Sequence, residues 1–161
     1  MSELIEKFIT VAESQLGVEE EPRGSNWGTR VADYLASVRI AQPASWCAAF
    51  VFWTYKKTMT GVTQKFLLPQ TGHANTMYNL AAKYQVPKGD TPKRGDIFTL
   101  LTNPKTGAGH TGIVTGVDLE AGTYDTIEGN TNDEGSREGY EVCRRTRKLS
   151  AKELRGFIRI I

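Results

Sequence analysis

An apolar run that begins with a cysteine constrains this chain more than any other feature. Trp46 and Cys47 open the run WCAAFVFW, which ends at Trp53. Pro43 and Ser45 stand just before it. Proline marks helix boundaries and serine is a favoured N-cap residue. The pattern therefore predicts a helix that begins near Cys47 and is apolar nearly all round, as a central buried helix is.

The position of Cys47 makes it a candidate nucleophile. A thiol in the first turn of a helix feels the positive end of the helix dipole, which lowers its pKa and favours the reactive thiolate. The alternative is a buried structural thiol, since free cysteines are among the most buried residues. The second cysteine, Cys143, lies in the strand-like stretch YEVCR with no surrounding pattern of histidine or acid. We interpret Cys143 as structural.

A catalytic cysteine needs a base, usually histidine, and a third group that orients the base. The chain has two histidines. His110 lies in GAGHTGIVTGV, which is glycine-rich and then alternating and β-branched, so it predicts the start of a strand. His73 lies in TGHA, a helix-cap or surface context, and is the second choice. We expect His110 to act as the base.

A further strand candidate ends on Glu128 and Asn130, two residues apart. Residues i and i+2 of a strand share a face. If this strand pairs with the one that carries His110, both polar side chains can face the imidazole. Taken singly, Glu128 could be a surface carboxylate and Asn130 a turn residue. The order Cys, His, Glu-x-Asn favours a catalytic set.

These motifs resemble those of the CHAP family, the cysteine- and histidine-dependent amidohydrolases and peptidases, which belong with the NlpC-type and papain-like cysteine hydrolases. The matching stretches are SWCAAFV, GHTGIV and IEGNTN, with further matches at QLGVEE, GSNWG, GDI and GFIRI. The resemblance implies cleavage of amide bonds in bacterial peptidoglycan, as by phage endolysins, tail-associated lysins and autolysins. Some members bind calcium through an acidic loop before the cysteine. Residues 39–45 carry no carboxylate here, so calcium dependence is not carried over.

The residues and the resemblance together predict a mechanism. The Cys47 thiolate, paired with His110, attacks an amide carbonyl and forms a thioester. Glu128 orients the imidazole, and Asn130 supports that network or the neighbouring loop. The bond would be that of an N-acetylmuramoyl-L-alanine amidase or of a stem-peptide or cross-bridge endopeptidase. No cofactor or metal is expected.

Several residues near the motifs are candidates for substrate contact. Trp27 could line a groove or pack at a helix entry, and Trp46 could wall the cleft or brace the helix in the core. Gln42 could donate a hydrogen bond to the oxyanion. The cluster RRTRK at 144–148 is typical of a solvated strand edge that guards against edge pairing. A wall-binding patch is its alternative.

Other functional classes stay open at this point. One is a protease or deamidase toxin that acts on a protein with the same residues. Another is a non-catalytic wall-binding module that kept the fold, although intact motifs argue against it. A zinc protein has less support, because Cys47, His73, His110 and Cys143 lack paired metal-ligand spacing.

Length and charge set further expectations. The chain has 161 residues, which predicts one domain over 1–161, and we expect a monomer. A net charge of +2 does not argue for nucleic acid and is compatible with an anionic wall polymer. No signal peptide is visible, and no stretch approaches the roughly 18 apolar residues of a membrane span. We expect synthesis in the cytoplasm and release to the wall by a holin, phage tail, secretion machine or lysis; removal of a leader is the alternative.

Hydrophobic periodicity predicts helices first and strands afterwards. Helices are expected over 4–16, around 31–38 with a cap at Ser25 or Asn26, over 47–59 and over 71–84. Strands are expected over 97–101, 110–117, 122–127, 140–147 and 156–161. This order predicts an α+β fold, with N-terminal helices packed against a C-terminal antiparallel sheet as in papain-like proteins.

Overall fold

The chain folds into a group of N-terminal helices followed by a C-terminal sheet, as predicted. The computed structural model describes residues 2–131 and 139–161. The helices are α1 (Ser2–Glu13), α2 (Thr29–Ser37), α3 (Cys47–Thr58), α4 (Ala74–Leu80) and the 3₁₀ helix η1 (Ala82–Tyr84). The strands are β1 (Ile97–Asn103), β2 (Ala108–Asp118), β3 (Thr123–Thr131), β4 (Glu141–Lys148) and β5 (Leu154–Ile158). Among the described residues, no helix is both long and apolar enough to cross a bilayer.

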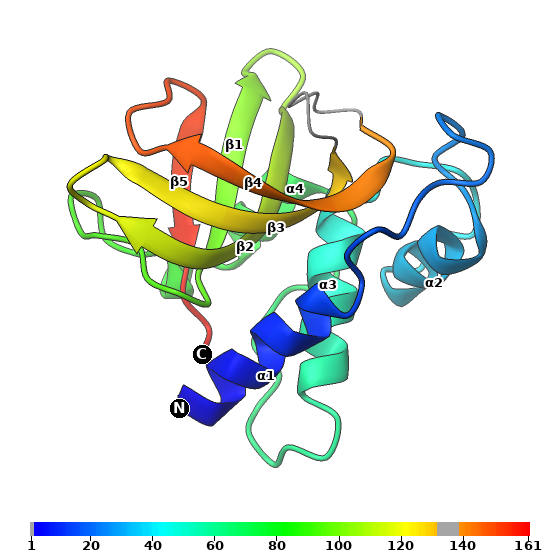
Figure 1. Cartoon of the computed structure of the whole chain (residues 1–161), viewed down its shortest axis with the longest axis horizontal. Coiled ribbons are helices and arrows are strands. Elements are labelled where there is room, and N and C mark those ends of the chain that lie inside the picture. Colours follow the sequence, from blue (N-terminus) through cyan, green and yellow to red (C-terminus); the bar gives the residue numbers. More distant parts are fainter. Residues whose placement is uncertain (1, 132–138) are drawn as a thin grey trace.

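The strands form one antiparallel sheet in the order β4-β3-β2-β1-β5. The first four follow one another as a meander, and β5 returns to pair with the free side of β1 (Figure 1). Strands β2 and β3 are neighbours, with Ile113 opposite Ile127. The predicted strand of His110 therefore lies beside the predicted strand of Glu128.

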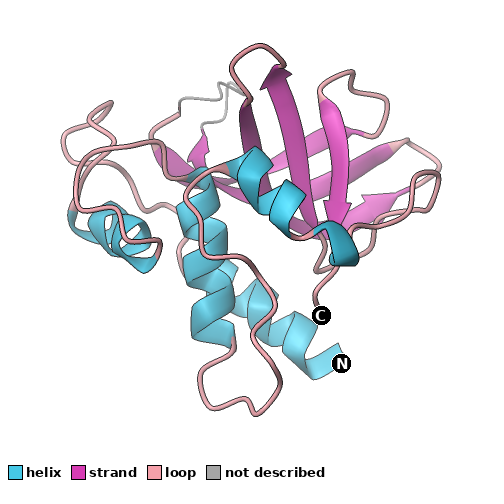
Figure 2. Cartoon of the chain, turned by 180° about the vertical axis from the view of Figure 1, so that it is seen from behind, coloured by secondary structure: helices cyan, strands magenta, loops and turns pink. Residues whose placement is uncertain are grey.

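Helix α3 occupies the centre of the molecule. It contacts α1 and α2 as well as strands β2 and β3 (Figures 1 and 2). Every residue from Cys47 to Tyr55 is buried. This burial confirms the prediction of a central helix that is apolar nearly all round. The core around it takes Phe8 from α1, Tyr34 from α2, Ile113 from β2 and Ile127 from β3.

Gly129 allows strand β3 to approach the start of α3. A Cβ at this position would lie 2.7 Å from the Trp46 ring and 2.8 Å from Phe50 Cβ. Contacts that short would force backbone or buried rings to move. The absence of a side chain at Gly129 thus sets how closely Glu128, the preceding residue, can come to Cys47.

The helix caps differ from the prediction. The N-cap of α3 is Trp46 rather than Ser45, and no side chain caps it. Helix α2 has Gly28 as its N-cap, with φ 137°, a conformation that favours glycine. The expected cap Ser25 instead accepts a hydrogen bond from the Trp27 N–H in a local turn.

The predicted helix over 71–84 is divided into α4 and η1. His73 is the N-cap of α4, and its ring accepts the Thr76 N–H at 3.4 Å. The cap context expected for His73 is thus confirmed.

Candidate active site

The structure brings His110 and Glu128 together. Antiparallel pairing of β2 with β3 places them side by side, and Nε2 of His110 donates to Oε2 of Glu128 at 2.7 Å. His110 is 1% exposed and Glu128 is 0% exposed. A buried, charge-assisted hydrogen bond of this length holds the ring in one orientation.

Cys47, the first residue of α3, meets the same imidazole from the helix side. Burial raises the pKa of the Cys47 thiol, but interaction with His110 and with the N–H groups of Thr111 and Ala48 outweighs it, so the pKa lies below its ordinary value. The residue is 6% exposed, so it is buried except for a small accessible area. These contacts favour the thiolate.

The pKa of His110 moves in the direction that complements Cys47. Burial lowers the pKa of the ring, but interactions with Cys47 and then with Glu128 outweigh burial and raise it to about 9. The two shifts together favour a thiolate–imidazolium pair. Because Nε2 is engaged by Glu128, Nδ1 is the ring nitrogen left to exchange a proton with the thiol; it has no hydrogen-bond partner among the described residues.

Glu128 accepts hydrogen bonds at both carboxylate oxygens. Thr126 Oγ1 donates to Oε1 at 2.6 Å, and Arg147 donates from Nε to Oε1 at 2.5 Å and from Nη2 to Oε2 at 2.6 Å. Burial raises the pKa of the carboxyl group, but Arg147 and His110 outweigh burial and lower it to about 2. Glu128 is thus ionised at neutral pH.

Arg147 was missed by reasoning from the sequence. The sequence pattern predicts a solvated strand edge over residues 144–148. This prediction holds for Arg144, whose side chain is 55% exposed and pairs with Glu13. It is wrong for Arg147, whose side chain is 17% exposed. Burial along β4 alternates from Arg144 to Lys148, and Arg147 belongs to the less exposed face. Strand alternation could have separated the two arginines. It could not have said which face is covered.

The side chain of Asn130 hydrogen-bonds at the start of α3. With its amide oriented to suit its neighbours, it donates to the Gly139 carbonyl at 2.6 Å and accepts the Trp46 N–H at 3.3 Å. The expected alternation fails because β3 changes register between Glu128 and Thr131, and Asn130 has φ 54°. Of the two expectations for Asn130, these contacts favour support of the neighbouring loop.

The candidate substrate contacts separate into buried and accessible residues. Trp46 is 0% exposed, its Nε1 donates to Glu20 Oε1 at 2.8 Å, and its ring stacks on Tyr34. The expectation that Trp46 walls the cleft is therefore wrong, because the side chain braces the core. Trp27 is half-buried against the core and Gln42 is exposed, and their contact with substrate stays a prediction.

The remaining residues of the zinc alternative do not complete a metal site. His73 caps α4, and Cys143 lies on β4 opposite Glu128. Within residues 2–131 and 139–161, no three His, Cys, Asp or Glu side chains are grouped as metal ligands would be.

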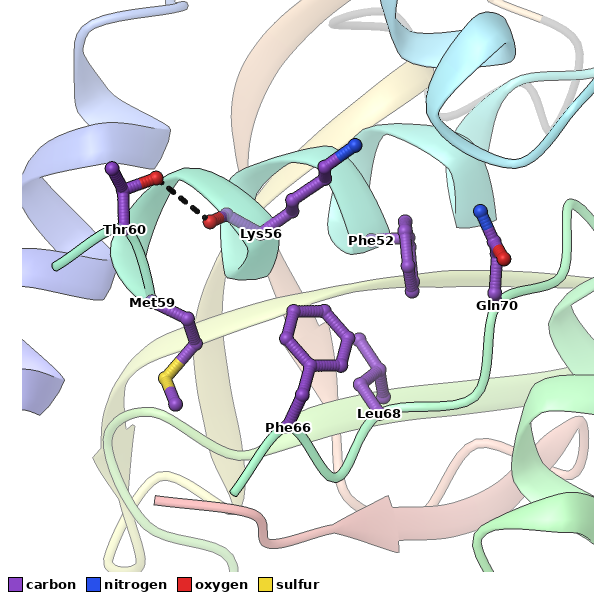
Figure 3. Close-up of a pocket in the computed structure, with 7 residues that line it drawn as sticks. All are labelled: Phe52, Lys56, Met59, Thr60, Phe66, Leu68 and Gln70. Carbon is purple, nitrogen blue, oxygen red and sulfur yellow. Dashed lines mark hydrogen bonds between the residues drawn. The ribbon is translucent and has the colours of Figure 1, made fainter. Parts of the chain in front are cut away.

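A pocket of about 320 Å³ lies at the other end of α3 (Figure 3). It is formed by the C-terminal half of that helix and the segment after it, and none of the predicted site residues lines it. Its lining residues are Phe52, Lys56, Met59, Thr60, Phe66, Leu68 and Gln70. The pocket is thus separate from the cysteine–histidine pair.

Comparison with known proteins gives matches of two kinds. The CHAP domain family matches residues 39–130, more than half of the chain. Two solved structures are similar: the crystal structure of Ly7917, with a TM-score of 0.56 and 18% identity over 96% of this chain and 61% of that chain, and the wild-type endolysin LysIME-EF1, with a TM-score of 0.47 and 16% identity over 96% and 63%. The chain spans about three fifths of their length. No curated protein matches.

The family match and the geometry concern the same part of the molecule. Residues 39–130 include the start of α3 with Cys47, the strand with His110 and the strand that carries Glu128. The likeness to Ly7917 confirms the α+β fold. The chain belongs to the CHAP domain family.

Proposed function

We propose that this protein is a peptidoglycan hydrolase that cleaves an amide bond through a thioester on Cys47. One observation carries the proposal: a thiol at a helix N-terminus lies close enough to an imidazole for each to shift the pKa of the other, and the imidazole hydrogen-bonds to a buried carboxylate. This is the arrangement of nucleophile, base and orienting group that amide cleavage needs. Membership of the CHAP domain family supports it, and the titles of the similar structures include an endolysin.

In the first step the Cys47 thiolate attacks the amide carbonyl carbon and the carbonyl oxygen takes the negative charge. The N–H groups of the first turn of α3 favour that charge, since no N-cap side chain occupies the helix start. The imidazolium of His110 then gives its Nδ1 proton to the amide nitrogen. The C–N bond breaks, the amine leaves and a thioester remains.

In the second step water replaces the amine. Neutral His110 accepts a proton from water as the oxygen attacks the thioester, and the carbon–sulfur bond breaks to return the Cys47 thiolate. Glu128 keeps the ring in one tautomer and stabilises its positive charge in both steps. No other chemical group is needed for this sequence.

The setting follows from the same proposal. We propose residues 1–161 as one catalytic domain, acting on the wall after release by a holin, phage tail, secretion machine or lysis. The bond is either the N-acetylmuramoyl-L-alanine link or a peptide bond of the stem or cross-bridge.

Fragment analysis tests both activity and bond. Purified peptidoglycan is treated with the parent protein, Cys47→Ala and Cys143→Ala, and turbidity and fragment masses are recorded. We expect lysis by the parent and by Cys143→Ala, and a loss of several orders of magnitude in rate for Cys47→Ala. New N-terminal alanine would identify the amidase, and new termini inside the peptide the endopeptidase. Near-parent lysis by folded Cys47→Ala would exclude the proposed mechanism.

A further inference from the structure

We propose that Arg147 is a positioning residue of this reaction, which holds Glu128 and, through Glu128, the imidazole of His110. The inference rests on the proposed function and adds a member that neither the sequence pattern nor the family match supplies, since the matched segment ends at residue 130. It begins from the fork of two hydrogen bonds between the Arg147 guanidinium and the Glu128 carboxylate.

The fork removes the rotational freedom of the carboxylate. Each oxygen of Glu128 receives two hydrogen bonds: Oε1 from Thr126 and Arg147, and Oε2 from His110 and Arg147. A bidentate arginine fixes the plane of a carboxylate as well as its place. The plane of Glu128 in turn decides where Oε2 meets the imidazole.

Arg147 is itself held by an aromatic ring that also contacts His110. Its guanidinium carbon lies 5.1 Å from the centroid of the Phe98 ring. The same ring lies 5.9 Å, centroid to centroid, from His110. Strand β4 carries Arg147 opposite Tyr124 of β3, so the long side chain extends along the sheet to reach Glu128. The guanidinium, carboxylate and imidazole therefore form one packed unit.

Arg147 also balances the charge of the site. Thiolate, imidazolium, carboxylate and guanidinium alternate in sign along the row Cys47, His110, Glu128 and Arg147, and their charges sum to zero. Without the guanidinium the buried row would carry one net negative charge, which a low-dielectric interior disfavours. The more basic of the two anions, the Cys47 thiolate, then takes up a proton most readily, and the thiol is the less reactive form.

Other ionisable groups near Glu128 do not replace Arg147. Tyr124 is buried, and burial raises the pKa of its hydroxyl, with the Glu128 charge adding to the rise. Cys143 lies opposite Glu128 on β4. Neither group can carry positive charge. Among the described residues that bond to Glu128, Arg147 is the permanent cation.

The test compares Arg147→Lys and Arg147→Met with the same changes at Arg144, an exposed arginine on the same strand. Turnover of solubilised peptidoglycan fragments is measured against pH, and alkylation of Cys47 by iodoacetamide is timed without substrate. We expect Arg147→Met to lower kcat by about 10–100-fold with little change in KM, as loss of an orienting partner does. The acid limb of its pH profile should move to higher pH, and alkylation at about pH 6 should slow. Arg147→Lys keeps the charge but not the fork of two hydrogen bonds, so its kcat should fall between those of the parent and Arg147→Met. The Arg144 variants should match the parent.

A double-mutant cycle separates positioning from a general effect on structure. In a Glu128→Gln background, Arg147→Met should cost little further kcat, because its effect passes through the carboxylate. Additive losses would overturn the proposal, as would a parent-like kcat and pH profile in folded Arg147→Met. If only Arg147→Lys folds, its pH profile decides the question in the same way. Failure of both Arg147 variants to fold while the Arg144 variants fold would assign Arg147 to stability alone.

The outcome also distinguishes this inference from the proposed function. If folded Cys47→Ala still hydrolyses peptidoglycan, the proposed function fails and the Arg147 proposal fails with it. If Cys47→Ala is inactive while Arg147→Met behaves as the parent, the function stands and only the role of Arg147 is withdrawn.

Discussion

His110 Nε2 lies 2.7 Å from Glu128 Oε2, and both side chains are shielded from solvent by the sheet and helix α3. The contact engages Nε2 of the ring. It leaves Nδ1 for proton exchange with the thiol. We expect the reactivity of the thiol and the stability of the fold in acid to depend on this contact.

Replacement of His110 should be as damaging as loss of the nucleophile. We expect His110→Ala to lower kcat/KM by several orders of magnitude, because the cysteine and its base act as a unit. His73→Ala is the matched control, since His73 only caps α4, and it should keep near-parent activity. The measurement is kcat/KM on solubilised peptidoglycan. An active His110→Ala beside an inactive His73→Ala would reassign the base.

Cys47 should react with alkylating agents well below the pH at which an ordinary thiol does. The imidazolium of His110 and two backbone N–H groups hold the pKa of Cys47 below its usual value despite burial. At about pH 6 a thiol of pKa ~8.5 is almost wholly protonated, so Cys47 should be labelled before Cys143. Timed labelling read by peptide mass provides the measurement.

The selectivity of labelling should depend on His110. In His110→Ala the rate at Cys47 should fall to that of an ordinary buried thiol. First labelling of Cys143 in the parent would contradict the ion pair.

Glu128 should make stability dependent on pH in acid. Its pKa is lowered from 4.5 to about 2 in the folded state, so its contribution is present above pH 4.5 and is lost as pH falls through 2. That contribution is on the order of 3 kcal/mol. The free energy of unfolding of the parent should exceed that of Glu128→Gln most above pH 4.5, and the gap should shrink towards pH 2. Urea unfolding at a series of pH values measures it.

An exposed acid provides the control for that experiment. Glu120→Gln, in the exposed turn between β2 and β3, should track the parent across the range. His110 adds an opposite dependence: its pKa is raised from 6.5 to about 9, so its contribution is full below pH 6.5 and lost as pH rises through 9. A pH-independent gap between the parent and Glu128→Gln would contradict the lowered pKa.

Trp46 should matter for stability through its indole N–H. Trp46→Phe keeps an aromatic ring but removes the hydrogen bond to the buried Glu20, which should cost about 1–3 kcal/mol in free energy of unfolding. Trp27→Phe, at a half-buried tryptophan, is the control and should cost less. Chemical denaturation measures both. A larger loss for Trp27→Phe would show that the bond to Glu20 is not the brace.

Local sequence patterns were enough to predict the main helices and strands and the pairing of His110 with Glu128. A cysteine at the start of an apolar helix, a histidine at a strand start and an acid on the next strand are short-range features. Once helices precede strands and neighbouring strands pair, the fold class follows and His110 meets Glu128. These inferences needed only the periods of helix and strand and the preference of sequential strands to be neighbours.

The tertiary structure alone decided which faces of the strands are covered and where the alternation of side chains along a strand breaks. A register shift in β3 directs Asn130 to the loop before Cys47. The approach of β3 to α3 buries Trp46. The covered face of β4 turns Arg147 inward onto Glu128. Each depends on contacts between segments far apart in the chain. The sequence by itself determined the helices and strands and the order of the candidate reactive groups, because those are local features. Packing decided which side chains are buried and which partner the long side chain of Arg147 meets, because both depend on what the fold places opposite.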